Sequence, residues 1–404
     1  MDRVKNTLNN IISIVDKEKN GFNEPTVEGG TLGIAIFYYF CHQYFKEDQY
    51  LDKAEEMVEK SINLISAISE QDEFVPKYIG DSLSSVIASF GKGLLFIENK
   101  FNYNYNFSSY YEVISDILQT LLEEDIKRKD YDFFSGALSS AYFFLNRLYY
   151  SNGNDKVCKR NLEKIYENAK EASVHYNENE IYWKAPSYMN QVYLGLSHGS
   201  AMMINFWSKL YQLNVIDSKN EEETIWLNKA VNFVFERKRD FVDGYFPHKA
   251  FSSETEEKTQ LSMCYGDLGI IYSLFNANKT LKNIKYEDVI DKMLYTSSLR
   301  QQESQYTYDT GILYGASGIG YIFEYFTTEK GENTYENTIN YWNNQILTYR
   351  TADNDFVYGF KEDKNENARF SFAWGVTGMG IRLMQSHSVQ LPSINELLLI
   401  GIKL

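Results

Sequence analysis

The sequence predicts an all-α protein: an (α/α) toroid, or barrel, of seven degenerate helical-hairpin repeats that form an inner and an outer ring of helices. Three observations predict this fold class. A glycine-led apolar motif recurs along the chain, and amphipathic stretches separate its copies. In addition, the 404 residues include only 5 prolines, which favours long helices because proline breaks helix interiors.

The recurring motif is a glycine, two further residues, a second small residue and then an aromatic-rich apolar stretch. Successive copies lie 49 to 67 residues apart, which leaves room for two helices and two loops in each repeat. Glycine suits a crowded loop before a helix, since it allows close backbone approach and positive φ. The residues that we take as equivalent are Gly30, Val86, Gly136, Gly199, Gly266, Gly315 and Gly375.

Two kinds of helix are expected. The motif segments are apolar nearly all round, which predicts a buried inner ring. The segments between them, such as 51–68 and 332–349, carry apolar residues at three- and four-residue spacing and predict an amphipathic outer ring. No Pro/Gly/Ser-rich or strongly charged linker interrupts the pattern, so we predict one domain over residues 1–404.

Composition excludes several classes of protein. The net charge of −15 comes without a basic stripe, so a nucleic-acid partner is not expected. No apolar run is long enough to span a membrane, and the first 22 residues alternate polar and apolar positions like an amphipathic helix, unlike a signal peptide. The three cysteines are far apart and odd in number, which argues against a disulfide framework. We therefore expect a cytoplasmic protein.

Taken together and in order, the motifs resemble the lanthionine cyclase (LanC-like) family from Gly29 to the leucine-rich tail. Asp132 precedes the third glycine motif, His198 lies in the GLSHG of the fourth, and Cys264 and Tyr265 lie in an MCYG where the family has WCYG. The resemblance implies the toroid fold and a reaction. Such cyclases add a peptide cysteine to a dehydrated serine or threonine, which forms a thioether ring.

The resemblance also implies a zinc ion, held by the fifth-motif cysteine and by a Cys-His pair in the sixth motif. Here the sixth motif has Leu313 and Tyr314 in place of that pair, so only Cys264 remains. A catalytic zinc normally needs three protein ligands. We therefore predict no stable zinc and no other cofactor. Gln260 is a second departure, at a position where the family usually has arginine.

The candidate catalytic residues are His198, Asp132 and Tyr265. Histidine passes protons near neutral pH, Asp132 can orient it or act as an acid or base, and Tyr265 can donate a hydrogen bond to a developing enolate oxygen. Structural roles are the alternatives: a satisfied histidine, a helix N-cap at Asp132, and packing for Tyr265.

Residues beside the expected metal position are candidates for contact with the substrate. These are Cys264, Tyr314 and Gln260. Cys264 can equally be a small buried apolar residue, because its neighbours carry no positive charge that would favour the thiolate.

Three functions follow from these observations. The first is a zinc-independent cyclase acting on a dehydrated, cysteine-containing precursor peptide, with dehydration by a separate dehydratase; relatives whose cyclase domains lack the zinc ligands make this plausible. The second is an inactive family member that binds a precursor peptide or a partner enzyme. The third and weakest is a sugar-processing toroid that uses Asp267 and Glu28 as paired carboxylates. Whether the chain is an enzyme stays open at this point.

Overall fold

The computed structural model describes residues 2–69, 82–101, 103–239, 244–252, 258–301, 307, 309–331, 334–352, 355–358, 366–388 and 390–403. The chain separates into two compact units, each assembled from several stretches of sequence. The first comprises Met1–Val75, Gly93–Asn106 and Thr307–Leu397, and the second comprises Pro76–Lys92, Phe107–Tyr306 and Leu398–Leu404. The single-domain organisation stays a prediction.

The first unit is built from helices in sequence-adjacent pairs. Helix α2 packs on α3, α13 packs on α14, and α16 packs on both α1 and α2. The elements are α1 (Asp2–Glu18), η1 (Lys19–Gly21), α2 (Thr31–Phe45), α3 (Gln49–Ser69), α13 (Ala316–Lys330), α14 (Glu336–Thr348), α15 (Glu366–Phe370), α16 (Val376–Gln385) and η3 (Asn395–Leu397). Helix α4 (Leu83–Lys100) contributes its first half to the second unit and its second half to the first.

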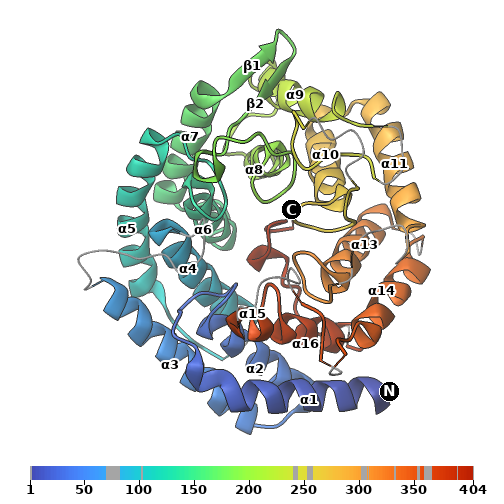
Figure 1. The fold of residues 1–404 in the computed structure, drawn as a ribbon. Coiled ribbons are helices and arrows are strands. Elements are labelled where there is room, and N and C mark those ends of the chain that lie inside the picture. The colour runs from blue at the N-terminus through green and yellow to red at the C-terminus, as the bar shows by residue number, and fades with distance from the viewer. Residues whose placement is uncertain are drawn as a thin grey trace. The chain divides into compact units, whose positions relative to one another are not determined.

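The second unit has one row of helices, α6, α8 and α10, backed by a second row formed by α5, α7, α9 and α11 (Figure 1). The bounds are α5 (Ser108–Lys127), α6 (Ala137–Tyr150), α7 (Lys156–Ala172), α8 (Ser200–Gln212), α9 (Glu221–Phe235), α10 (Asp267–Leu281) and α11 (Ile284–Ser298). Between α7 and α8 lie strands β1 (Val174–Asn177) and β2 (Glu180–Tyr182) and the short helix η2 (Pro186–Tyr188).

The antiparallel pair β1–β2 is an addition to the predicted all-helical pattern. Its sequence carries a β signal, since aromatic and β-branched residues flank the polar turn Asn177–Glu180. The strands are too short to change the fold class.

The two expected kinds of helix are present. In α8 every residue from Ser200 to Tyr211 is buried, whereas α7 buries only Cys158, Asn161, Leu162, Ile165, Tyr166 and Ala169, which recur at three- and four-residue spacing. Burial of apolar side chains all round α8 is the arrangement expected of a helix covered on every side.

Six of the seven motifs begin their helices in the predicted way, directly after the glycine. Gly136 shows why glycine is needed, because a Cβ there would lie 2.3 Å from the Asp130 carbonyl oxygen, which instead accepts a hydrogen bond from Ala137 N. The expectation of positive φ is wrong: these glycines are extended, with φ between −97° and −140°. The second motif also departs from the prediction, since α4 begins at Leu83 and Val86 lies inside it.

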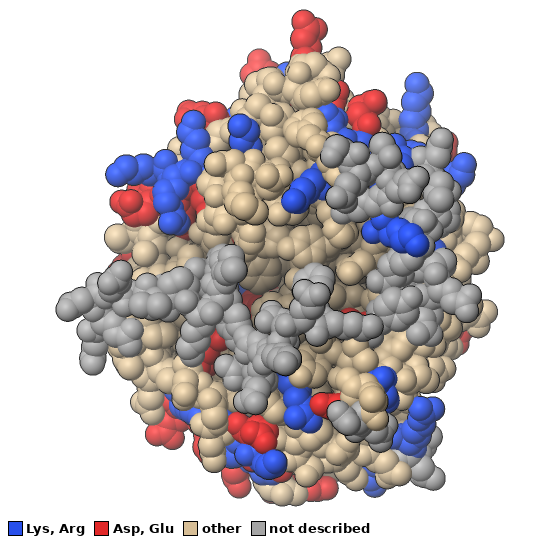
Figure 2. Space-filling view, viewed as in Figure 1, with Lys and Arg blue, Asp and Glu red and all other residues tan. Residues whose placement is uncertain are grey.

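Lys and Arg side chains are interspersed with Asp and Glu around the face drawn in Figure 2. Among the described residues, no helix combines the length and apolar character that a membrane crossing requires.

Candidate functional site

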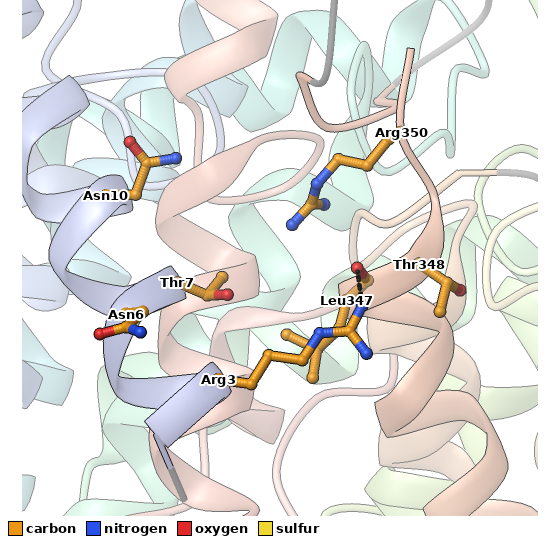
Figure 3. Close-up of a pocket in the computed structure, with 7 residues that line it drawn as sticks. All are labelled: Arg3, Asn6, Thr7, Asn10, Leu347, Thr348 and Arg350. Carbon is orange, nitrogen blue, oxygen red and sulfur yellow. Dashed lines mark hydrogen bonds between the residues drawn. The ribbon is translucent and has the colours of Figure 1, made fainter. Parts of the chain in front are cut away.

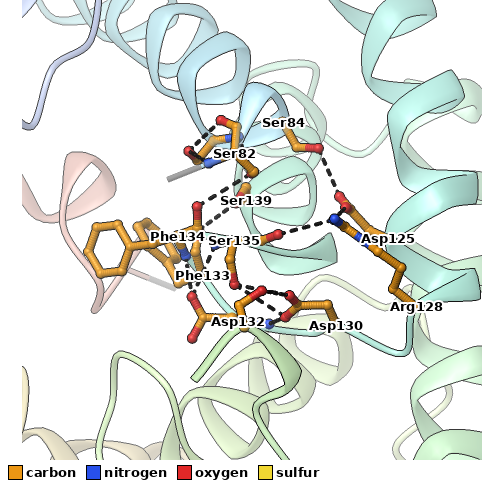
Figure 4. Close-up of polar contacts among 12 residues, drawn as sticks. Ser82, Ser84, Asp125, Arg128, Asp130, Asp132, Phe133, Phe134, Ser135 and Ser139 are labelled. Carbon is orange, nitrogen blue, oxygen red and sulfur yellow. Dashed lines mark hydrogen bonds and ion pairs between the residues drawn. The ribbon is translucent and has the colours of Figure 1, made fainter. Parts of the chain in front are cut away.

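The site begins at a tight turn that precedes α6. Asp132 Oδ1 accepts hydrogen bonds from Phe134 N at 2.7 Å and Ser135 N at 3.1 Å, as Figure 4 shows. The alternative role of Asp132 as the N-cap of a helix is therefore wrong in detail, because the N-cap of α6 is Gly136. A short carboxylate side chain fits the backbone N–H groups of a turn equally well.

The other carboxylate oxygen of Asp132 holds His198. Asp132 Oδ2 lies 2.5 Å from His198 Nδ1, and the two side chains are 0% and 5% exposed. An ionised carboxylate can only accept, so this contact requires the proton on Nδ1. The lone pair of the neutral imidazole is then on Nε2.

Aromatic rings surround the imidazole of His198. The Tyr188 ring lies closest, with 4.0 Å between centroids, and the rings of Tyr265, Tyr193 and Phe134 follow at 5.6, 5.8 and 5.8 Å. Burial raises the pKa of both Tyr265 and Tyr193, so their phenols stay protonated at neutral pH and can donate hydrogen bonds.

A second aspartate joins this turn to the segment that carries Tyr188. Asp130 accepts hydrogen bonds from Asp132 N at 3.1 Å, Ser135 Oγ at 3.1 Å and Ser187 Oγ at 2.5 Å. Ser187 belongs to η2, directly before Tyr188. Neither Asp130 nor Tyr188 was among the sequence candidates, although the D-x-D pattern at 130–132 is a signal that could have found Asp130.

Cys264 and Tyr265 lie on a loop that contacts the segment leading to His198. The Cys264 carbonyl accepts a hydrogen bond from Leu196 N at 3.0 Å, and its side chain is buried. His248 also lies near Tyr265, with 5.7 Å between the ring centroids. Three of the predicted residues, His198, Asp132 and Tyr265, are thus neighbours, with Cys264 next in sequence.

For the remaining predicted residues the structure gives backbone contacts. Gln260 uses its carbonyl to accept a hydrogen bond from Asp267 N, in the loop that starts α10. Leu313 and Tyr314 belong to the first unit, before α13, where Leu313 is buried and donates its N–H to the Ala373 carbonyl.

These residues do not fit the zinc that the family resemblance implies. Leu313 has no donor atom, and a neutral phenol at Tyr314 is a poor ligand, so these two positions do not supply the thiolate and imidazole that zinc prefers. In the part of the chain that the structure describes, no group of three His, Cys, Asp or Glu residues is placed to hold a metal ion.

Asp267 is engaged in a structural contact. Its buried carboxylate lies 2.8 Å from Arg300 Nη1 and accepts hydrogen bonds from Tyr245 N and Phe246 N. These contacts hold a loop against the start of α10, which argues against a role as one of two paired catalytic acids.

Comparison with known proteins agrees with this reading of the motifs. No curated protein matches the chain in sequence. Among solved structures, nisin cyclase matches with a TM-score of 0.73 and 18% identity over 99% of this chain and 98% of that one, which shows that the fold is the predicted all-α toroid class. The family described as lanthionine synthetase C-like protein matches residues 21–399. Because that match spans most of its length, the chain belongs to the lanthionine synthetase C-like family.

Proposed function

We propose that this chain is a peptide cyclase that joins a cysteine thiol to a dehydroamino acid without zinc. The observation that carries the proposal is the buried Asp132–His198 pair with Tyr265 beside it, in a member of the lanthionine synthetase C-like family. The substrate is a dehydrated, cysteine-containing precursor peptide, and a separate dehydratase prepares it. We further propose that this occurs in the cytoplasm.

Proton transfer through His198 is the chemical core of the proposal. Nε2 removes the proton from the peptide thiol, and the thiolate attacks the β-carbon of the dehydroamino acid, which forms the carbon–sulfur bond. The electrons of the carbon–carbon double bond move toward the neighbouring carbonyl oxygen. The imidazolium then returns the proton to the α-carbon, so the addition is balanced without any other reactant.

The neighbouring residues support these steps. Asp132 stabilises the imidazolium and fixes the ring, since both of its oxygens are already engaged. The neutral phenol of Tyr265 is suited to donate a hydrogen bond to the enolate oxygen. Holding thiol and acceptor together contributes to the rate by proximity alone, and Cys264, Gln260 and Tyr314 remain the proposed peptide contacts.

Loss of free thiol from a dehydrated, cysteine-containing peptide tests the proposal. The wild type should consume the thiol faster than buffer, and His198→Ala and Asp132→Asn should slow it by roughly 10²- to 10⁴-fold. His175→Ala is the matched control, because His175 lies on β1 and contacts Trp226 instead. Equal rates for wild type and His198→Ala would refute the assignment.

The alternative is an inactive family member that binds a precursor peptide or a partner enzyme. The replacement of two zinc ligands by Leu313 and Tyr314 favours it, since loss of ligands is the expected result of relaxed selection on catalysis. Saturable peptide binding with no loss of thiol above the buffer rate would identify this function.

A further inference from the structure

A pocket of about 710 Å³ lies in the first unit, between the polar face of α1 and the end of α14. It is lined by Arg3, Asn6, Thr7, Asn10, Leu347, Thr348 and Arg350, which include two arginines and no acid. Figure 3 shows the guanidinium of Arg350 and the hydroxyl of Thr7 pointing toward one another across it.

Helix periodicity explains why four of the lining residues come from α1. Arg3, Asn6, Thr7 and Asn10 recur at three- and four-residue spacing and share one face of α1. The apolar face of the same helix is buried through Val4, Leu8, Ile11, Ile12 and Val15. The family match begins at residue 21, so α1 lies outside it.

The two arginines bring positive charge together in a pocket whose lining residues include no carboxylate. Arg3 Nη2 donates to the Leu347 carbonyl at 3.0 Å, and Arg350 Nη1 donates to the carbonyls of Ile346 and Tyr349 at 3.3 and 3.2 Å. These bonds cap the end of α14 and leave the remaining guanidinium N–H groups for other acceptors.

The positive charges of Arg3 and Arg350 repel one another in the pocket. Burial lowers the pKa of Arg350, and the nearby charge of Arg3 lowers it further. Asp355 acts in the opposite direction, but its carboxylate is paired with Arg369 at 2.9 Å. A bound anion would relieve the repulsion between the two arginines.

We propose that this pocket binds the phosphate group of a small phosphate-bearing molecule. Two guanidinium groups match the charge of about −1.5 to −2 that a phosphate monoester carries at pH 7, better than they match a single carboxylate. Within the described part of the chain the side chains of Asn6, Thr7 and Asn10 make no hydrogen bonds, so they are available to further phosphate oxygens. The volume leaves room for the rest of the molecule.

Thermal unfolding of the whole chain with inorganic phosphate, at constant ionic strength set with chloride, tests this proposal. Wild-type protein should show a saturable rise in melting temperature, and Arg350→Gln and Arg3→Gln should each raise the half-saturating concentration by roughly ten-fold or more. Lys5→Gln is the matched control on the exposed part of the same helix and should behave as wild type.

A charge-conserving variant and a second measurement extend this test. Arg350→Lys retains the charge but loses the planar fork, so it should bind phosphate more weakly than wild type while folding normally. Broadening of the phosphorus NMR resonance of inorganic phosphate on addition of protein measures binding without depending on protein stability. An equal response to acetate, no response beyond chloride, or an unchanged response in Arg350→Gln and Arg3→Gln would overturn the assignment.

Discussion

Asp132 shows how one side chain can determine both local backbone structure and side-chain chemistry. Its Oδ1 closes the turn before α6, and its Oδ2 holds His198. A carboxylate engaged on both oxygens has little freedom to rotate, so the imidazole it contacts is fixed as well. Asp132→Asn should therefore slow the proposed proton transfer, because it removes the negative charge beside the imidazole, while its amide oxygen can still accept the hydrogen bonds of the turn.

Asp267 illustrates a residue of similar burial with a structural role. Burial raises the pKa of Asp267 to about 6, so at pH 7.5 it is charged and opposite Arg300. Asp267→Asn removes the negative charge that lies 2.8 Å from the buried guanidinium of Arg300, which should lower the free energy of unfolding by about 3–5 kcal/mol. Denaturant unfolding at pH 7.5 measures this, with Asp288→Asn on the exposed side of α11 as control. A loss no larger than that of the control would contradict the structural role.

At the scale of elements, the segment between β2 and α8 is attached to the Asp132 turn through Asp130. The hydrogen bond from Ser187 to Asp130 fixes η2, and η2 places the Tyr188 ring over His198. The side chain of His198 is only 5% exposed. A peptide that reaches Nε2 must therefore displace or fit beside Tyr188.

Ser187→Ala should make η2 more mobile and expose His198, because it removes the hydrogen bond to Asp130. We expect diethyl pyrocarbonate to modify His198 several-fold faster in Ser187→Ala than in wild type, as measured by mass spectrometry of the modified peptides. His387 is exposed and serves as an internal reference in the same sample. Unchanged modification of His198 in both Ser187→Ala and Tyr188→Ala would show that η2 does not restrict access.

The C-terminal segment is a second element held by tertiary contacts. Tyr142 and Asn205 donate to the Leu399 carbonyl, Tyr272 donates to the Ile400 carbonyl, and Lys209 Nζ donates to the Ile402 carbonyl at 2.7 Å. Side chains of helices α6, α8 and α10 therefore all bind the backbone of the same C-terminal segment. Lys209 is buried, and burial lowers its pKa to about 7.

Lys209 should make stability depend on pH. Between about pH 7 and pH 10.5 the unfolded chain holds a proton on this side chain that the folded chain has released, so stability rises with pH across that window. The free energy of unfolding of wild type minus that of Lys209→Met should increase by about 2 kcal/mol from pH 7 to pH 9. Lys219→Met, at an exposed position, should leave the pH profile unchanged. Parallel profiles for wild type and Lys209→Met would contradict the lowered pKa.

At the scale of the whole molecule, the family fold occurs in a chain that has Leu313 and Tyr314 at two positions where the family resemblance implies zinc ligands. The chain keeps the family's fold over nearly its full length at 18% identity to nisin cyclase. Burial of the apolar helices supplies the stability of this fold.

Purified protein should contain well below one zinc per chain by elemental analysis, and chelator should leave its melting temperature unchanged. Leu313→Cys combined with Tyr314→His introduces the thiol and the imidazole that zinc prefers as ligands. This double variant should raise the zinc content toward one per chain. Leu313→Ala combined with Tyr314→Ala is the control for volume. A full equivalent of zinc in wild type would contradict the proposal.

The sequence by itself determined the repeat and the two kinds of helix, because helix periodicity and glycine-led loops are local patterns. The family resemblance came from particular motif residues and their order along the chain. It also identified His198, Asp132 and Tyr265 as candidates. Only the tertiary structure decided which residues meet: Asp132 and His198 are 66 positions apart, and Asp130 and Ser187 are 57 apart. These contacts are made by irregular loops, where no periodicity relates position in the chain to position in space.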